Sequence, residues 1–260
     1  MTSVKLNGKV IIVTGSTQGL GEGIACYLAQ LGATSIVLCG RNQEKGEKVR
    51  RTLEELNLSS IFIPADLTKE SDCRFLVTEC DRHFGRVDGL VNAAGLSNRG
   101  YLEDTTVEMW NLLFAVNVRA PFILTQEVVR IMKREKIAGS IVNIITISSY
   151  GGQPYLTAYC SSKGALATFT KNVAHALRRD RIRVNGLNIG WMDTPNEHIV
   201  QKAMGKPDNW LELAEAKQPF GRLLKPLDVA KLTAYLLSDD SQMMTGSIID
   251  YDQNVIGSYD

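Results

Sequence analysis

Tyr159 and Lys163 are two residues whose types and spacing suit proton transfer. They lie four positions apart, and the apolar residues of the following ALATFTKNVAHAL keep helical spacing, so both side chains are expected on one face of a helix. A phenol with a pKa of about 10 is a poor base at neutral pH, and a neighbouring ammonium group favours the phenolate. Tyr159 is therefore expected to act as a general base toward an alcohol or as a general acid toward a ketone.

Hydroxyl side chains are concentrated around this pair, in NIITISSYGGQPYLTAYCSSKG from Asn143 to Gly164. One of them would orient the oxygen of the substrate. If the strand expected here runs to Ser148, its period of two places Thr146 and Ser148 on the same face. Either hydroxyl would then reach the substrate, and both are candidates.

A glycine-rich turn, TGSTQGLG, follows the first apolar run of the chain and leads into an amphipathic segment. Glycines allow a tight turn, and the free amides at the start of a helix favour a phosphate group. The turn therefore predicts a phosphate-binding site, although glycines also occur in such turns for geometry alone.

These residues must be positioned by elements that alternate along the whole chain. Short runs rich in valine and isoleucine are apolar on successive residues, which is typical of strands buried on both faces. They are Val10–Thr14, Ser35–Cys39, Ile61–Ala65, Gly89–Ala93, Ser140–Ile145 and Ile182–Ile189. The longer segments between them have apolar residues at helical spacing. This alternation predicts an α/β fold with a doubly wound parallel sheet, Rossmann-like, in a single domain over residues 1–260.

Residues 191–221 interrupt this alternation after the sixth predicted strand. The segment WMDTPNEHIVQKAMGKPDNWLELAEAKQPFG mixes tryptophan and methionine with many polar residues. It follows a carboxyl end of the sheet, where ligands bind, so we expect a substrate lid. A helical excursion that serves only packing is the alternative.

Four motifs, in this order, resemble those of the short-chain dehydrogenase/reductase family. They are the glycine turn, Asn92-Ala93-Ala94-Gly95 after the fourth run, Asn117 in AVNV, and the pair Tyr159 and Lys163. The Y-x-x-x-K spacing alone is common on surface helices, but together the motifs cover essentially the whole chain. The resemblance implies a doubly wound sheet that binds a nicotinamide cofactor, usually in a homodimer or homotetramer.

The resemblance also implies roles for single residues. Asn117 would hold a water that relays protons toward Lys163, and Lys163 would hold the nicotinamide ribose. Asp66 would bind the adenine amino group, although a helix N-cap is a competing role for it. Thr146 stands thirteen residues before Tyr159, where the family has its substrate-orienting serine, which favours Thr146 over Ser148.

The site residues expected on these grounds form three overlapping groups. Cofactor binding is expected at Gly15, Thr17, Gln18, Gly19, Leu20, Gly21, Arg41, Asn42, Asp66, Leu67, Asn92, Ala93, Ala94, Gly95, Tyr159, Lys163, Gly190, Met192 and Thr194. Catalysis is expected at Asn117, Thr146, Ser148, Tyr159 and Lys163, and substrate binding at Thr146, Ser148, Tyr159 and Trp191.

The residues after the second run indicate which nicotinamide cofactor is used. The sequence there is Cys39-Gly40-Arg41-Asn42, whereas an acidic side chain at this place would bind the ribose diol and repel a 2′-phosphate. A guanidinium group suits a phosphate dianion. We therefore expect NADP, with NAD as the alternative.

The predicted function is the interconversion of a secondary alcohol and a ketone by an NAD(P)-dependent oxidoreductase. The polar residues of the expected lid favour a sugar or polyol, and Trp191 would pack on an apolar sugar face. A reductase of 3-oxoacyl chains or other ketones is the first alternative. A nucleotide-binding sensor or scaffold with weak catalysis is the alternative of another class, favoured by Ile145-Thr146 where Ser-Ser is usual and by the missing proline in Asn188-Ile189-Gly190.

Composition narrows the partners and the compartment. A net charge of +1 in 260 residues gives no reason to expect nucleic acid or an anionic membrane as partner, and we see no signal peptide and no apolar run of about 18 residues. Five cysteines without a C-x-x-C pair fit free thiols in the cytoplasm. The three histidines have no metal-ligand spacing, so no metal site is expected.

Overall fold

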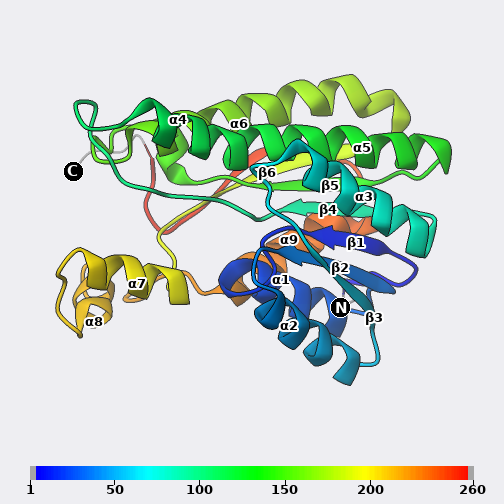
Figure 1. Cartoon of the computed structure of the whole chain (residues 1–260), viewed down its shortest axis with the longest axis horizontal. Helices are drawn as coiled ribbons and strands as arrows, with labels where there is room; N and C mark the ends of the chain where they lie inside the picture. The colour runs from blue at the N-terminus through cyan, green and yellow to red at the C-terminus, as the bar shows by residue number, and fades with distance from the viewer. Residues whose placement is uncertain (1–3, 257–260) are drawn as a thin grey trace.

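Seven parallel strands form one sheet at the centre of the computed structural model, which describes residues 4–256 (Figure 1). The strands are β1 (Val10–Val13), β2 (Ser35–Gly40), β3 (Ser59–Pro64), β4 (Gly89–Asn92), β5 (Ser140–Ile144), β6 (Arg183–Ile189) and β7 (Ile248–Tyr251). Their order is β3-β2-β1-β4-β5-β6-β7. The winding direction therefore reverses between β1 and β4, and ligands bind at such a switch point. The predicted α/β fold is confirmed.

Helices cover both faces of this sheet, as Figure 1 shows. On one face lie α3 (Glu70–Phe84), α4 (Val107–Phe114), α5 (Ala120–Arg134) and α6 (Thr157–Leu177). On the other lie α1 (Gly19–Gln30), α2 (Gln43–Glu55) and α9 (Pro226–Leu237). The remaining helices, α7 (Pro195–Ala203) and α8 (Trp210–Glu215), fall within the expected lid and project from the body.

Successive side chains of each strand point to opposite faces of the sheet, and both sets are apolar, which explains why helices cover both faces. In β1, Val10 and Ile12 join the core beneath α3, α5 and α6, whereas Ile11 and Val13 join the core beneath α1, α2 and α9. All four side chains are at most 3% exposed. A strand that buries both faces must be apolar at successive positions, which is the pattern in the sequence.

Two sheet elements differ from expectation, both at strand ends or edges. The strand β7 was not predicted, because it lies at the sheet edge, where Ile248–Tyr251 stays partly exposed and includes an aspartate. The strand β5 ends at Ile144, and Ile147–Tyr150 forms a 3₁₀ helix. The strand alternation assumed for Thr146 and Ser148 is therefore wrong.

The helical run Val107–Arg134 is long and apolar enough to cross a membrane by composition alone, with a mean hydropathy of 1.4. It comprises α4, a π-helical turn at Ala115–Arg119 and α5. Packing accounts for much of this apolarity, because Ile123, Leu124 and Val128 are buried in the core beside α3. A buried core helix of a globular protein can be equally long and apolar.

Candidate active site

The glycine turn between β1 and α1 requires its glycines. A Cβ atom at Gly15 would lie 2.8 Å from the Cα of Ala94, and one at Gly21 would lie 2.4 Å from the carbonyl oxygen of Gly15. Gly15 and Gly19 also have positive φ angles, which side chains disfavour. No side chain caps the start of α1, so its first amides remain available to an anion.

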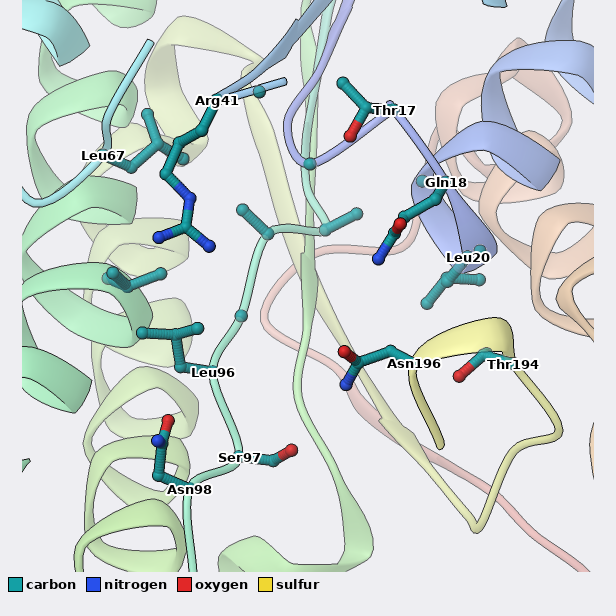
Figure 2. Close-up of a pocket in the computed structure, with 18 of the residues that line it drawn as sticks. Thr17, Gln18, Leu20, Arg41, Leu67, Leu96, Ser97, Asn98, Thr194 and Asn196 are labelled. Atoms are coloured by element: carbon teal, nitrogen blue, oxygen red, sulfur yellow. The ribbon is translucent and has the colours of Figure 1, made fainter. Parts of the chain in front are cut away.

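A cleft of about 570 Å³ opens at this turn, along the carboxyl ends of β1 to β4 and against the start of α7 (Figure 2). It brings together most of the residues expected at the cofactor: Gly15, Thr17, Gln18, Gly19, Leu20, Gly21, Arg41, Asp66, Leu67, Ala93, Ala94, Gly95 and Thr194. Figure 2 places Arg41, Thr17 and Gln18 at one end and Ser97, Asn98 and Asn196 toward the other.

The end of the cleft near β2 is basic, and position 40 is crowded by the side chain of Thr17. A Cβ atom on Gly40 would lie 2.6 Å from the Cγ2 of Thr17. Arg41 is exposed into the cleft, and Lys45 on α2 donates to the Oε1 of Gln18 at 2.7 Å. Lys45 was missed in the sequence because only the helical turn after Asn42 brings its ammonium group back over the glycine turn.

Asp66 lines the cleft after β3, and its carboxylate is held by the next turn of chain. Its Oδ1 accepts the backbone amide of Thr68 at 3.1 Å and the Thr68 hydroxyl at 2.8 Å. Burial opposes the charge, but these hydrogen bonds outweigh it, so the pKa of Asp66 is lowered. Neither residue caps α3, whose N-cap is Lys69.

Besides Tyr159 and Lys163, four residues expected at the cofactor lie outside the lining of the cleft. Asn42 caps α2 by accepting the amide of Lys45. Asn92 is 2% exposed and donates to Asn143 across the sheet. Met192 is buried in the core, and a Cβ atom on Gly190 would lie 2.0 Å from Asp252.

Lys163 is buried beside Tyr159 on α6 but is not aimed at its hydroxyl. The Nζ of Lys163 donates to the carbonyl oxygen of Ile144 at 2.8 Å and lies 5.9 Å from the centroid of the Tyr159 ring. Burial lowers the pKa of Lys163 to about 8. A Cβ atom on Gly95 would lie 3.4 Å from this Nζ, so the ammonium group lies directly behind the cleft wall.

The pKa of Tyr159 differs from the sequence-based expectation. Burial raises the pKa of the phenol to about 12, and a hydrogen bond with Thr146 opposes this rise only in part. Lys163, which was expected to lower the pKa of Tyr159, is not among the groups that shift it, and its ammonium group donates to the Ile144 carbonyl instead. In the protein alone, the phenol is therefore protonated at neutral pH.

Thr146 and Ser148 are both buried, and the Thr146 hydroxyl donates to the Ser148 hydroxyl at 3.2 Å, but their other partners differ. Thr146 contacts the Tyr159 phenol and caps the 3₁₀ helix by accepting the amide of Ser148 at 3.2 Å. The hydroxyl of Ser148 donates to Gln153 at 2.6 Å. The threonine side chain thus lies against the phenol, whereas the serine is engaged by the following loop.

Asn117 is fully buried in the π-helical turn between α4 and α5. Its Oδ1 accepts the amide of Leu96, and its Nδ2 donates to the Leu96 carbonyl and to the Ser162 hydroxyl. Such turns are frequent at functional sites. In this structure the side chain ties the loop after Gly95 to α6, so Asn117 fixes one wall of the cleft.

The lid contributes residues that differ in part from those expected. Thr194 caps α7 and lines the cleft, together with Asn196 and Val200. Trp191 does not line the cleft, and its Nε1 donates to Glu197 at 2.9 Å. His198, which lies 2.8 Å from Asp193, also lies outside the lining.

Several further residues of the cleft were missed in the sequence. The loop after β4 adds Leu96, Ser97, Asn98 and Arg99 to its lining. These residues directly follow the Asn92-Ala93-Ala94-Gly95 motif in the sequence, and this position could have indicated that they line the cleft. Which side chains of this loop face the cleft depends on its tie to Asn117, and that contact spans 21 positions.

Comparison with known proteins gives matches along nearly the whole chain. The family model described as enoyl-(acyl carrier protein) reductase matches residues 15–253. The NADP-dependent (R)-specific alcohol dehydrogenase of Lentilactobacillus kefiri is 34% identical over 245 residues, covering 94% of each chain.

Solved structures also match this chain over nearly its whole length. A short-chain type dehydrogenase/reductase from Mycobacterium marinum superposes with a TM-score of 0.87 at 26% identity, covering 96% of both chains. The L-sorbose reductase of Gluconobacter frateurii, solved with NADPH and L-sorbose, superposes with a TM-score of 0.93 at 26% identity, covering 99% of this chain and 100% of that one.

Proposed function

Because the chain belongs to the short-chain dehydrogenase/reductase family, we propose that it is an NADP-dependent oxidoreductase that interconverts a secondary alcohol and a ketone. The observation that carries the proposal is the junction of the cleft with α6. Gly95 lines the cleft, and the buried Lys163 lies directly behind it, beside Tyr159 on the same helix.

The cleft fits a dinucleotide with a 2′-phosphate. Gly15 and Gly21 keep the turn tight because a Cβ atom on either would collide with neighbouring backbone, and the uncapped amides at the start of α1 remain available to a pyrophosphate. Arg41 and Lys45 supply positive charge at the end of the cleft where position 40 carries a glycine and no carboxylate. This arrangement supports NADP over NAD. When bound, the reduced cofactor supplies hydride to a ketone, and the oxidised cofactor accepts hydride from an alcohol.

The residues of the chain supply the proton and the orientation. Tyr159 donates a proton to the carbonyl oxygen during reduction and accepts one from the alcohol during oxidation. Thr146, which contacts the same phenol, orients the oxygen of the substrate, with Ser148 as the second candidate. Lys163 holds the nicotinamide ribose, and Asn117 keeps the loop after Gly95 in place.

A polyhydroxylated substrate, a sugar or polyol, agrees best with the polar lining of the cleft. Ser97, Asn98, Arg99 and Asn196 line it between the loop after β4 and the lid. The full-length likeness to an L-sorbose reductase supports the same class. Apolar 3-oxoacyl chains would leave these polar groups unpaired.

We also propose a homodimer or homotetramer in the cytoplasm. Val107, Trp110 and Leu112 on α4 and Phe122 on α5 are exposed, and large apolar side chains at the surface fit a subunit interface. Five free cysteines fit a reducing compartment. Light scattering of the purified protein measures the assembly, and a monomer would contradict this part of the proposal.

One experiment tests the reaction. The protein is incubated with NADPH and a panel of ketones and ketoses, and with NADP and the matching alcohols, while the absorbance of the reduced nicotinamide is followed. We expect turnover that Tyr159→Phe abolishes. Cofactor binding without turnover across the panel would instead support a sensor.

A further inference from the structure

Arg99, from the loop after β4, and Glu197, from the lid, lie close to each other beside the cleft. Arg99 belongs to the loop after β4 and lines the cleft, and Glu197 belongs to the first turn of α7. Their side chains are 30% and 17% exposed, and the Nη2 of Arg99 lies 3.8 Å from the Oε1 of Glu197. This long contact leaves most donors of the guanidinium group available to a ligand.

Glu197 is held in place by two donors that bind the same oxygen. Its Oε1 accepts the indole Nε1 of Trp191 at 2.9 Å and the Nε2 of Gln201 at 2.6 Å. Gln201 is 4% exposed. No hydrogen bond recorded within residues 4–256 goes to Oε2, so one oxygen of a fixed carboxylate is free to accept.

Arg99 is also fixed, and its position is set by the start of the catalytic helix. Its guanidinium carbon lies 5.3 Å from the centroid of the Tyr155 ring. The neighbouring Gly100 donates to the carbonyl of Tyr155 at 3.0 Å and accepts the amide of Thr157 at 3.2 Å. The loop that carries Arg99 is therefore bound to the segment that enters α6.

The negative charge of Glu197 acts electrostatically on the phenol of Tyr159. The carboxylate of Glu197 is one of the groups that raise the pKa of Tyr159. The loop that carries Arg99 is bound to the residues that enter α6, the helix of Tyr159, so Arg99 and Glu197 lie on the side of the cleft that faces Tyr159.

We propose that Arg99 and Glu197 bind a second hydroxyl group of the substrate, near the reacting carbon, and so select hydroxylated ketones over simple ones. A hydroxyl group both donates and accepts hydrogen bonds, and here it meets a carboxylate oxygen and a guanidinium group together. A substrate without that hydroxyl leaves both charged groups facing apolar surface, which sites of this kind reject strongly. This inference rests on the proposed function and specifies its substrate class.

The test compares two ketones that differ by one hydroxyl group, 3-hydroxy-2-butanone and 2-butanone, each reduced with NADPH. Glu197→Gln keeps an oxygen that can accept from Trp191 and Gln201 but removes the charge. Glu212→Gln makes the same change at an exposed glutamate on α8 and is the matched control. For Glu197→Gln, we expect the ratio of kcat/KM for the hydroxylated ketone to that for 2-butanone to fall about 10- to 100-fold, and for the control we expect no change.

A second set of variants tests whether the two residues act on one group. We expect Arg99→Met to lower the same ratio, and the double variant to lower it less than the product of the two single effects, as for residues that share a partner. Glu197→Gln should also lower the pKa seen in the pH profile of alcohol oxidation, because a negative charge near Tyr159 is removed.

The outcomes separate the inference from the proposed function. Wild-type protein that reduces neither ketone nor L-sorbose would contradict the proposed reaction. Wild-type protein that reduces 2-butanone as well as 3-hydroxy-2-butanone would leave the reaction standing and overturn the inference. Equal losses on both ketones in Glu197→Gln would also overturn it, because they would assign Glu197 a role only in lid structure.

Discussion

Lys163 is expected to destabilise the cofactor-free protein at neutral pH, so replacing it should raise stability while removing activity. The side chain is 4% exposed, and burial lowers its pKa from the ordinary 10.5 to about 8. Each pKa unit corresponds to about 1.4 kcal/mol, so at pH 7 the charged lysine costs about 3 kcal/mol of folding free energy. The hydrogen bond from Lys163 to the Ile144 carbonyl stabilises the folded state by about 1 kcal/mol.

Lys163→Met fills a similar volume without the charge. We therefore expect its free energy of unfolding at pH 7 to exceed that of the wild type by about 2 kcal/mol, the difference of the two contributions. Between pH 8 and pH 10.5 the unfolded wild-type chain holds a proton on Lys163 that the folded chain has lost. Wild-type stability should rise with pH over this window, and the advantage of the variant should shrink.

Urea unfolding followed by circular dichroism measures this, at pH 7 and again near pH 9.5, with protein concentration fixed and no cofactor present, because bound cofactor would stabilise the folded state. Lys171→Met, at an exposed position on the same helix, is the control and should change neither stability nor its pH dependence. A Lys163→Met protein that is less stable than the wild type at pH 7, or an advantage that does not shrink with pH, would refute the reasoning.

Three further predictions concern the cofactor and the substrate oxygen. Arg41→Ala should weaken NADP binding by about 10- to 100-fold and leave NAD binding unchanged in calorimetry; an equal loss for both would contradict the assignment of Arg41 to the 2′-phosphate. Gly40→Asp should lower the affinity for both cofactors because the new Cβ atom meets the Thr17 methyl group. The double variant Gly40→Asp with Thr17→Ser should recover the affinity for NAD but not that for NADP, because the new carboxylate repels the 2′-phosphate. Recovered affinity for NADP would contradict this repulsion. Thr146→Val should lower kcat/KM about 100-fold or more, and Ser148→Ala should lower it much less; the reverse order in steady-state kinetics would transfer the role to Ser148.

The sheet could be predicted because the successive apolar residues of each central strand indicate that both of its faces are buried. Ile11 and Ile12 are adjacent in sequence and buried on opposite faces, which only a strand covered on both sides allows. The edge strand β7 was missed for the same reason, since Ile248–Tyr251 is partly exposed and carries no such pattern. Likewise the turn of chain after β5 is local backbone geometry that alternation alone cannot reveal.

The sequence by itself determined the order of the elements, the glycine turn and the presence of Tyr159 and Lys163 on one helix, because these depend on residues within a few positions of one another. Only the tertiary structure decided where the ammonium group of Lys163 points, that Lys45 reaches Gln18, and that Arg99 meets Glu197. Those contacts join segments far apart in the chain. Their geometry is fixed by how helices and loops pack on the sheet, and no local pattern of residue types records it.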